Sequence, residues 1–191
     1  MIRHSAIGRS ALLAAIALAA LTLLPATASA QDFFSFLWGG GSREVISFSP
    51  SVAPRQIIVS FGDRKLYWVH SKGEAISYPI AVPREQSRWS GVSSVSSKRV
   101  NPGWTPTPEM RRENPKLPAY VPGGHPQNPL GPRALYLGAS MYRIHGTDAP
   151  WTIGTAASKG CIRMYSEDVV DLYPRVPVGT KVTVTWKKYT G

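Results

Sequence analysis

Apolar and polar positions alternate with a period of two in several short segments of this chain. Neighbouring residues of a strand face opposite sides of its sheet, so this period predicts half-buried strands. The clearest case lies near the end of the chain, where Val182, Val184 and Trp186 alternate with polar residues. The segments that we predict to be strands are 56–61, 65–70, 75–82, 134–137, 141–144 and 181–186.

Turn and cap residues separate these segments. Gly62-Asp63-Arg64 stands between the first two predicted strands and predicts a hairpin whose turn uses positive φ angles. Thr107-Pro108-Glu109 predicts the N-cap and first turn of a short helix. Ser166 predicts the N-cap of another helix, which Pro174 should stop. Many short strands with one or two short helices predict a mostly-β sandwich or barrel.

A long segment, residues 83–133, shows no sustained strand or helix period. It holds ten of the 17 prolines together with Trp89, Trp104 and Tyr120. We expect a stiff excursion that forms a wall or lid of a functional site, because long loops in compact domains usually have such a role. The alternative is a disordered insertion, which the aromatic residues disfavour.

The first thirty residues have the pattern of an export signal. Arg3, His4 and Arg9 form a basic start, residues 11–24 are apolar, and Ala28-Ser29-Ala30 matches a signal peptidase site. The apolar run is shorter than the roughly 20 residues that span a bilayer. We therefore expect residues 1–30 to be a cleaved signal peptide and the mature protein to lie in the periplasm or cell envelope.

Two segments complete the predicted organisation. Residues 31–54 combine Phe33, Phe34 and Trp38 with a run of glycines, and we expect an N-terminal arm and linker there. Residues 55–187 hold all the predicted strands. We expect this part to form one domain with one core.

The charge pattern limits the classes of partner. The formal net charge is +11, and it falls to +9 when Arg3 and Arg9 leave with the signal peptide. The basic residues are scattered and no nucleic-acid motif is present, so we expect no nucleic-acid partner. Outside the inner membrane such a surface would be attracted mildly to lipids and cell-wall polymers. We expect a monomer.

Cys161 is the only cysteine, so the exported protein cannot form an intrachain disulfide. One interpretation is a buried, inert residue. The other is a nucleophile, because a base and nearby positive charge activate a thiol. His145 can supply the base, and Lys159 and Arg163 can supply the charge. Gly160 leaves room for backbone N–H groups to hold the oxyanion of an acyl-transfer intermediate.

Two other histidines remain after the signal peptide is removed. His125 follows two glycines in the proline-rich segment and is the reserve candidate for the base. His70 lies in a hairpin strand, and we expect it at the surface. The histidines and the cysteine form no close ligand pair, so we predict no metal site and no cofactor.

Two motifs around these residues resemble a known family. Residues 144–147 read IHGT and residues 158–164 read SKGCIRM. Together they closely resemble the signature of the L,D-transpeptidase catalytic domain family, the YkuD-type enzymes of the bacterial cell wall. The resemblance covers roughly residues 55–187 and leaves residues 31–54 unexplained.

The resemblance implies an L,D-transpeptidase-like β-sandwich and a role for each motif residue. Cys161 would be the nucleophile and His145 the proton carrier, positioned by the backbone carbonyl of Gly146. Arg163 would meet the substrate or steady the site, although a salt bridge to Glu167 or Asp168 is an alternative. We interpret Ser158 mainly as a turn residue that fixes the loop.

The motif departs from the family at one position. Lys159 stands where the family commonly has histidine. A lysine can donate hydrogen bonds and lower a thiol pKa, but it cannot relay protons near neutral pH as imidazole does. The departure therefore places the role of general base on His145.

The resemblance also implies the reaction. Cys161 would attack the bond between diaminopimelate and the terminal D-alanine of a tetrapeptide stem and release D-alanine. The acyl group would then pass to an amine of a second stem, which makes a 3–3 cross-link. Three alternatives stay open. The acceptor could be water, as in an L,D-carboxypeptidase, or the amine of an envelope protein. The chain could also be an inactive wall-binding module.

Overall fold

The computed structural model describes residues 43–189, so the predicted signal peptide and most of the predicted arm lie outside the described part. Two α-helices are described, α2 (Pro108–Glu113) and α3 (Ser166–Arg175), with 3₁₀ turns at Glu85–Ser87 (η1) and Pro150–Thr152 (η2). Neither α-helix is long and apolar enough to cross a bilayer. The strands are β1 (Glu44–Ser47), β2 (Gln56–Ser60), β3 (Lys65–Ser71), β4 (Glu74–Pro83), β5 (Gly91–Val100), β6 (Arg133–Leu137), β7 (Arg143–His145), β8 (Ala156–Ser158), β9 (Ile162–Met164) and β10 (Lys181–Thr185).

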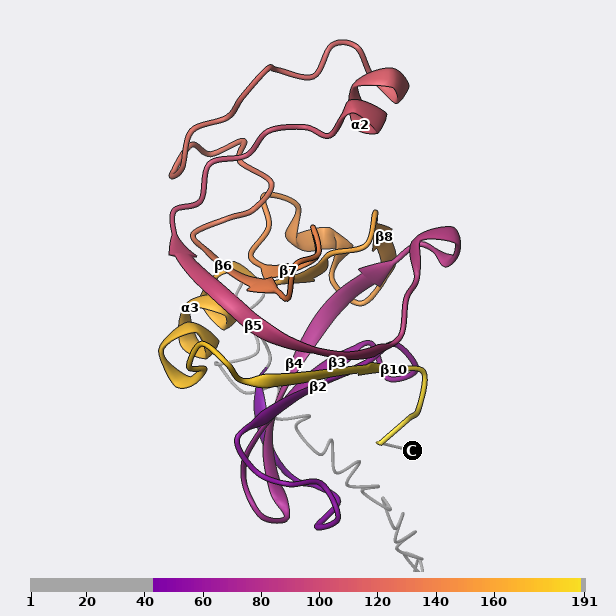
Figure 1. Cartoon of the computed structure of the whole chain (residues 1–191), viewed down its shortest axis with the longest axis vertical. Helices are drawn as coiled ribbons and strands as arrows, with labels where there is room; N and C mark the ends of the chain where they lie inside the picture. Colours follow the sequence, from indigo (N-terminus) through magenta and orange to yellow (C-terminus); the bar gives the residue numbers. More distant parts are fainter. Residues whose placement is uncertain (1–42, 190–191) are drawn as a thin grey trace, which may run out of the picture.

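The strands form a sheet that closes on itself (Figure 1). Its path runs β1-β4-β3-β2-β10-β5-β6-β7-β9, and β9 then pairs with β4 again. The closure is possible because β4 is long, with residues 74–79 paired to β3 and Ile80 and Ala81 paired to β9. The prediction of a mostly-β fold with one or two short helices is confirmed, but the predicted sandwich is a closed, barrel-like one.

Two hydrophobic clusters lie on opposite faces of the β2-β3-β4 region. Ile57 and Val59 of β2 belong to the main core, whereas Ile58 between them belongs to a smaller cluster with Phe48 and Tyr67. All five residues of β2 are therefore buried. Full burial on both faces explains why this strand is a continuous apolar run rather than an alternating one.

The sheet begins upstream of residue 55. Residues 44–47, which the sequence pattern assigned to the arm, form β1 and pair antiparallel with β4. Phe48 follows directly, is 7% exposed and stacks on Tyr189 at a centroid distance of 5.0 Å. The last part of the predicted arm is thus packed on the sheet.

The structure corrects the prediction for residues 83–133, because β5 occupies ten residues of that segment. Only Val95 of β5 is buried, and most of its other residues are serine or charged. No alternation marks such a strand in the sequence. Pairing of its backbone with β10 and β6 holds it in the sheet. The three-residue strands β8 and β9 were also missed, since a period of two cannot be recognised over three residues.

Of the predicted turns and helix caps, the cap of α2 is confirmed, whereas α3 and the hairpin turn differ from the prediction. Thr107 caps α2, since its side chain accepts a hydrogen bond from the Met110 amide at 3.2 Å. The prediction for α3 was wrong in detail, because Tyr165 is the N-cap and the helix includes Pro174 in its last turn. In the predicted hairpin turn only Arg64 has a positive φ, of 53°. Gly62 is needed there because a Cβ would lie 2.5 Å from the carbonyl oxygen of Trp186.

Residues 101–132, between β5 and β6, stand above one end of the barrel and carry α2 at their tip (Figure 1); we call them the lid. The base of the lid is held by Asn128, which is 2% exposed and donates to the carbonyl oxygens of Pro102 and Pro122 at 2.8 and 3.0 Å. An antiparallel β-bridge between Trp104 and Val121 joins the segment that leads to α2 and the segment that returns from it. No residue of α2 is buried. The lid thus has a fixed base and an exposed tip.

Asp168, in the first turn of α3, is fully buried, and neither of its carboxylate oxygens has a hydrogen-bond partner. An ion pair with Arg43 at 3.6 Å partly offsets the desolvation. The partner of Asp168 is therefore Arg43 and not Arg163, the alternative considered from sequence. Burial raises the pKa of Asp168 to about 7, and Arg43 opposes this shift.

The raised pKa predicts how Asp168→Asn changes stability with pH. The pKa of the folded protein lies above the ordinary value, so the stabilising contribution of this carboxyl is full below about pH 4 and is lost as the pH rises through about 7. We expect the amide to raise the free energy of unfolding at pH 8 by about 1–2 kcal/mol, a few degrees in Tm, and to change it little at pH 4. Thermal unfolding of both proteins across this range measures the difference, and parallel curves would contradict the account.

Candidate active site

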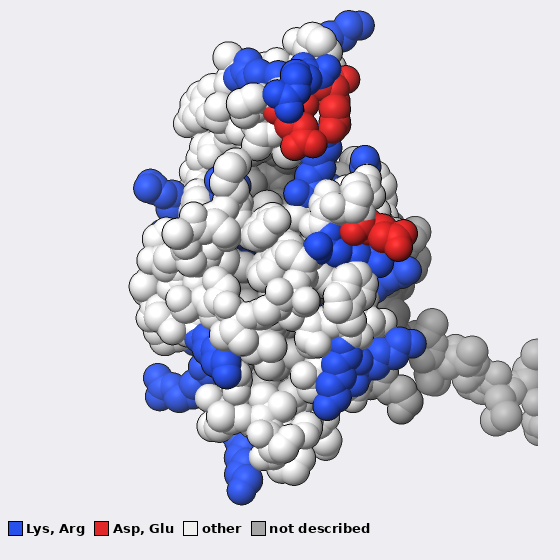
Figure 2. All heavy atoms as spheres, turned by 45° about the vertical axis from the view of Figure 1, so that its right-hand side comes forward, with Lys and Arg blue, Asp and Glu red and all other residues white. Residues whose placement is uncertain are grey.

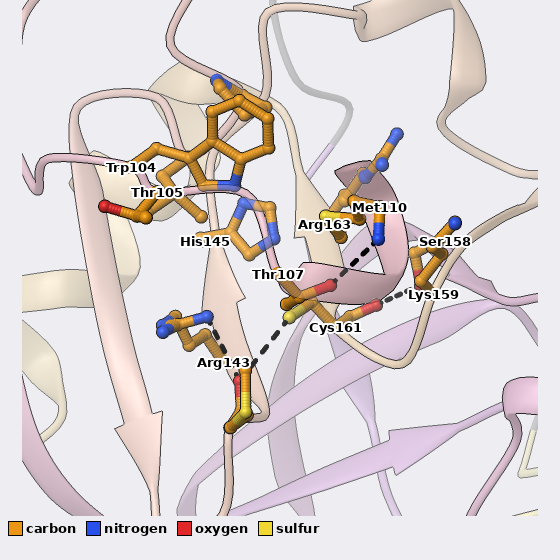
Figure 3. Close-up of a pocket in the computed structure, with 13 residues that line it drawn as sticks. Trp104, Thr105, Thr107, Met110, Arg143, His145, Ser158, Lys159, Cys161 and Arg163 are labelled. Atoms are coloured by element: carbon orange, nitrogen blue, oxygen red, sulfur yellow. Dashed lines mark hydrogen bonds between the residues drawn. The ribbon is translucent and has the colours of Figure 1, made fainter. Parts of the chain in front are cut away.

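A pocket of about 110 Å³ lies between the lid and the barrel (Figure 3). The lid supplies one wall, and β7, β8, β9 and the turns next to them supply the other. Cys161, His145, Ser158, Lys159 and Arg163, all selected from the sequence, line this single pocket. The remaining lining residues are Trp104, Thr105, Thr107, Met110, Pro129, Leu130, Met141 and Arg143.

Strand pairing brings His145 and Cys161 to the same pocket. β7 and β9 are parallel neighbours, with Ile144 opposite Ile162 and His145 opposite Arg163. Cys161 directly precedes β9, and this register places it next to Arg143 at the start of β7, whereas His145 lies two residues further along β7, opposite Arg163. Figure 3 shows both side chains at the pocket, and the Cys161 thiol lies 3.9 Å from the carbonyl oxygen of Met141.

His145 is 3% exposed, and its Nδ1 lies 2.5 Å from the carbonyl oxygen of Gly146. A carbonyl can only accept, so Nδ1 carries the proton and Nε2 keeps a free lone pair. Burial, together with the charges of Arg163 and Arg143, lowers the pKa of His145 to about 3, although the hydrogen bond with the Gly146 carbonyl opposes the shift. The imidazole is therefore neutral at physiological pH and able to accept a proton at Nε2.

The loop before Cys161 is fixed by its own hydrogen bonds. The Ser158 hydroxyl is 1% exposed and donates to the carbonyl oxygen of Cys161 at 2.5 Å, while the Gly160 amide donates to the same hydroxyl oxygen at 3.4 Å. The Ser158 hydroxyl thus joins the two ends of the segment 158–161. Gly160 has a φ of 125°, and a Cβ there would lie 2.4 Å from the ring of Tyr142. Glycine is required at this position by both conformation and space.

Two arginines supply positive charge to the pocket. Arg163 lies two residues after Cys161, and Arg143 lies two residues before His145. Residues two apart on a strand face the same side, which places each arginine with its neighbour on the pocket face. Arg143 was missed in the sequence analysis, although this spacing could have revealed it. Its Nε is buried without a hydrogen-bond partner.

Lys159 lies at the edge of the pocket and forms an ion pair with Glu113, the last residue of α2. This contact lowers the pKa of Glu113. Figure 2 shows that most charged side chains on this face are basic, and that acidic side chains form one group at the tip that carries α2 and another lower on the same face. Lys159 thus links the tip of the lid to the loop that carries Cys161.

The other histidines lie elsewhere. His125 lines a separate pocket near Asp148, and its Nδ1 accepts a hydrogen bond from the Gln127 amide at 3.2 Å. His70 is partly exposed and lies 3.4 Å from Glu74. Within residues 43–189, no three side chains of the His, Cys, Asp or Glu type are grouped to hold a metal ion. Of the histidines in this part of the chain, only His145 lines the pocket of Cys161.

The ion pair predicts an effect of Glu113→Gln on access to Cys161. Losing this contact should free the tip of the lid, since α2 has no buried residue. Exposed ion pairs are weak, so we expect alkylation of Cys161 by iodoacetamide to become only about two- to fivefold faster. The wild-type rate should rise with salt and the variant rate should not. Glu109→Gln, one turn earlier on α2, is the matched control, and an equal effect of both variants would disprove the role of the pair.

Comparisons with known proteins agree with this geometry. The YkuD profile, described as the L,D-transpeptidase catalytic domain, matches residues 54–184. The Escherichia coli protein named probable L,D-transpeptidase ErfK/SrfK is 40% identical over 144 residues, which are 71% of this chain and 45% of the relative. The chain therefore spans about half the length of the curated relatives that it matches.

Solved structures share the fold. The catalytic domain of the L,D-transpeptidase from E. faecium is 18% identical, covers 70% of this chain and 98% of its own, and has a TM-score of 0.53. A Brucella melitensis protein, described as a probable carnitine operon oxidoreductase, is 41% identical over 75% of this chain and 92% of its own, with a TM-score of 0.50. That description names another activity, but the family profile covers more than half of this chain. The chain belongs to the L,D-transpeptidase catalytic domain family.

Proposed function

We propose that this protein is an exported, cysteine-dependent peptidoglycan L,D-transpeptidase. One observation carries the proposal: Cys161 and a neutral His145, oriented by the Gly146 carbonyl, line the same pocket. A thiol beside a neutral, oriented imidazole is the arrangement that acyl transfer by cysteine requires. The reaction needs no metal or organic cofactor.

In the first half-reaction, the Cys161 thiol passes its proton to Nε2 of His145 and Sγ attacks the carbonyl carbon between diaminopimelate and the terminal D-alanine of a tetrapeptide stem. The tetrahedral oxyanion collapses, the C–N bond breaks, and His145 returns the proton to the leaving amine of D-alanine. A thioester on Cys161 remains. Protonating the buried imidazole costs free energy. The negative charge of the thiolate, and then of the oxyanion, lowers this cost and makes the proton transfer accessible.

In the second half-reaction, an amine of a second stem attacks the thioester. His145 accepts the proton of that amine, the C–S bond breaks, and the thiolate of Cys161 is released and reprotonated. The product is a 3–3 cross-link. Water as the acceptor would give carboxypeptidase activity, and an envelope protein as the acceptor would give protein-bound peptidoglycan.

The charge of the pocket supports an anionic substrate. Arg143, Arg163 and Lys159 line it, and stem peptides carry carboxylates that such groups bind. In the resting protein the ammonium group of Lys159 is paired with Glu113, so Arg143 and Arg163 are the stronger candidates for contact with the donor. The basic start, apolar run and cleavage pattern of residues 1–30 support export to the cell envelope.

The proposal predicts that Cys161→Ala abolishes the covalent adduct formed with a tetrapeptide donor, because no other thiol is present. His145→Ala should slow adduct formation at least about 100-fold, the scale of general acid–base catalysis. Intact-mass measurement of the purified mature protein shows the adduct, and His125→Ala is the matched control that should keep it. Cross-linking by the Cys161→Ala protein would defeat the assignment.

A second experiment distinguishes the acceptors. Purified cell wall is incubated with the wild-type protein, digested and analysed by mass spectrometry. Cross-linked dimers support transpeptidation, trimmed monomers indicate a carboxypeptidase, and muropeptides bound to a protein indicate attachment of that protein. A wild-type protein that forms no adduct with any donor would indicate a wall-binding module.

The low pKa of His145 gives a further prediction. Its value of about 3 in the folded protein lies below the ordinary 6.5, so the stability that this group contributes is full above about pH 6.5 and is lost as the pH falls toward 3. We expect the imidazole resonances of His145 to show no protonation between pH 8 and pH 5 in an NMR titration. A midpoint near 6.5 would contradict the buried, neutral state.

A further inference from the structure

Trp89 contacts the loop of Cys161 from outside the pocket. It lies between η1 and β5, is partly buried and does not line the pocket of Cys161. Its indole Nε1 donates to the carbonyl oxygen of Gly160 at 3.0 Å. Since 71 positions separate the two residues, the contact depends on the tertiary fold.

The contact belongs to a packed layer. The indole of Trp89 stacks on Tyr142 at a centroid distance of 4.7 Å and an interplanar angle of 6°. The ring of Tyr142 in turn fills the space that a Cβ of Gly160 would need. Both rings pack against the main core. The carbonyl of Gly160 is thus held by a donor that has little freedom to move.

The geometry of the peptide unit extends this restraint to Cys161. The Gly160 carbonyl and the Cys161 amide belong to one planar trans peptide, so they point in opposite directions. Holding the carbonyl therefore sets the direction of the amide N–H. On the other side of Cys161, its own carbonyl accepts from Ser158. The peptide units before and after Cys161 are both restrained.

The amide of Cys161 itself donates to no acceptor within residues 43–189. The Gly160 amide, by contrast, points to the Ser158 hydroxyl. A restrained and unpaired N–H next to a nucleophile is the group that stabilises the oxyanion of an acyl-transfer intermediate. A hydrogen bond to the carbonyl of the same peptide also polarises the N–H and makes it a better donor.

We propose that Trp89 is a positioning residue that acts through the Gly160–Cys161 peptide and aims the Cys161 amide at the oxyanion. The inference rests on the proposed acyl-transfer function. It assigns Trp89 no contact with substrate and no part in proton transfer. The loss of its N–H should therefore slow the steps that form an oxyanion and leave other reactions of the thiol unchanged.

Trp89→Phe tests this, because phenylalanine keeps a ring for stacking on Tyr142 and lacks the N–H. Two reactions of Cys161 are compared. Acylation by the tetrapeptide donor or by p-nitrophenyl acetate passes through an oxyanion. Alkylation by iodoacetamide does not. We expect acylation to slow about tenfold, as suits one hydrogen bond acting indirectly. Alkylation and its pH profile should stay within about twofold of wild type. The matched control is Trp151→Phe, at a tryptophan that is 77% exposed.

Replacing Trp89 by 3-benzothienylalanine exchanges the N–H for sulfur and keeps the shape of the ring. If Trp89→Phe unfolds, the acylation and alkylation rates of this second variant test the inference instead. Unchanged acylation overturns the inference. An equal slowing of acylation and alkylation also overturns it, because that result means a general structural role for Trp89. If wild type reacts with the ester but not with the peptide, the proposed function fails while the ester still tests Trp89. If wild-type Cys161 reacts with neither, both proposals fail.

Discussion

The three residues after Cys161 form β9, which pairs with β7 on one side and with β4 on the other. This double pairing closes the sheet and sets the position of the proposed nucleophile. It places Arg163 opposite His145 and holds Cys161, two residues before Arg163, at the same pocket as the imidazole. A shift of β9 by one residue would turn its side chains to the opposite face of the sheet. The geometry of the site thus depends on the register of a short strand whose backbone is paired on both edges.

Burial and charge together set the state of the site. His145 is neutral because it is buried between Arg143 and Arg163, and the Gly146 carbonyl selects its tautomer. The charges of Arg143 and Arg163 disfavour a protonated imidazole in the resting protein. In the proposed reaction, negative charge forms on the thiolate and the oxyanion, and these arginines can then stabilise it. The site is therefore preorganised for the charges of the intermediate rather than for its own resting state.

The loop of Cys161 is restrained by segments from three parts of the chain. Ser158 holds it from within, Trp89 from the segment before β5, and the lid reaches it through the ion pair of Lys159 with Glu113. The first two contacts are partly buried, whereas the ion pair is exposed. The loop is thus rigid on its inner side, while its contact with the lid is the weaker one.

The sequence by itself determined most core strands, the cap of α2 by Thr107 and the choice of Cys161 and His145 as candidate site residues, because these features have a local period or a local motif. Only the tertiary structure decided that β5 and β9 are strands, since their pairing partners hold them and their own side chains give no period. It also assigned Lys159 its partner on the lid, over 46 positions. Contacts between residues far apart in the chain depend on where the sheet closes, and no local pattern contains that information.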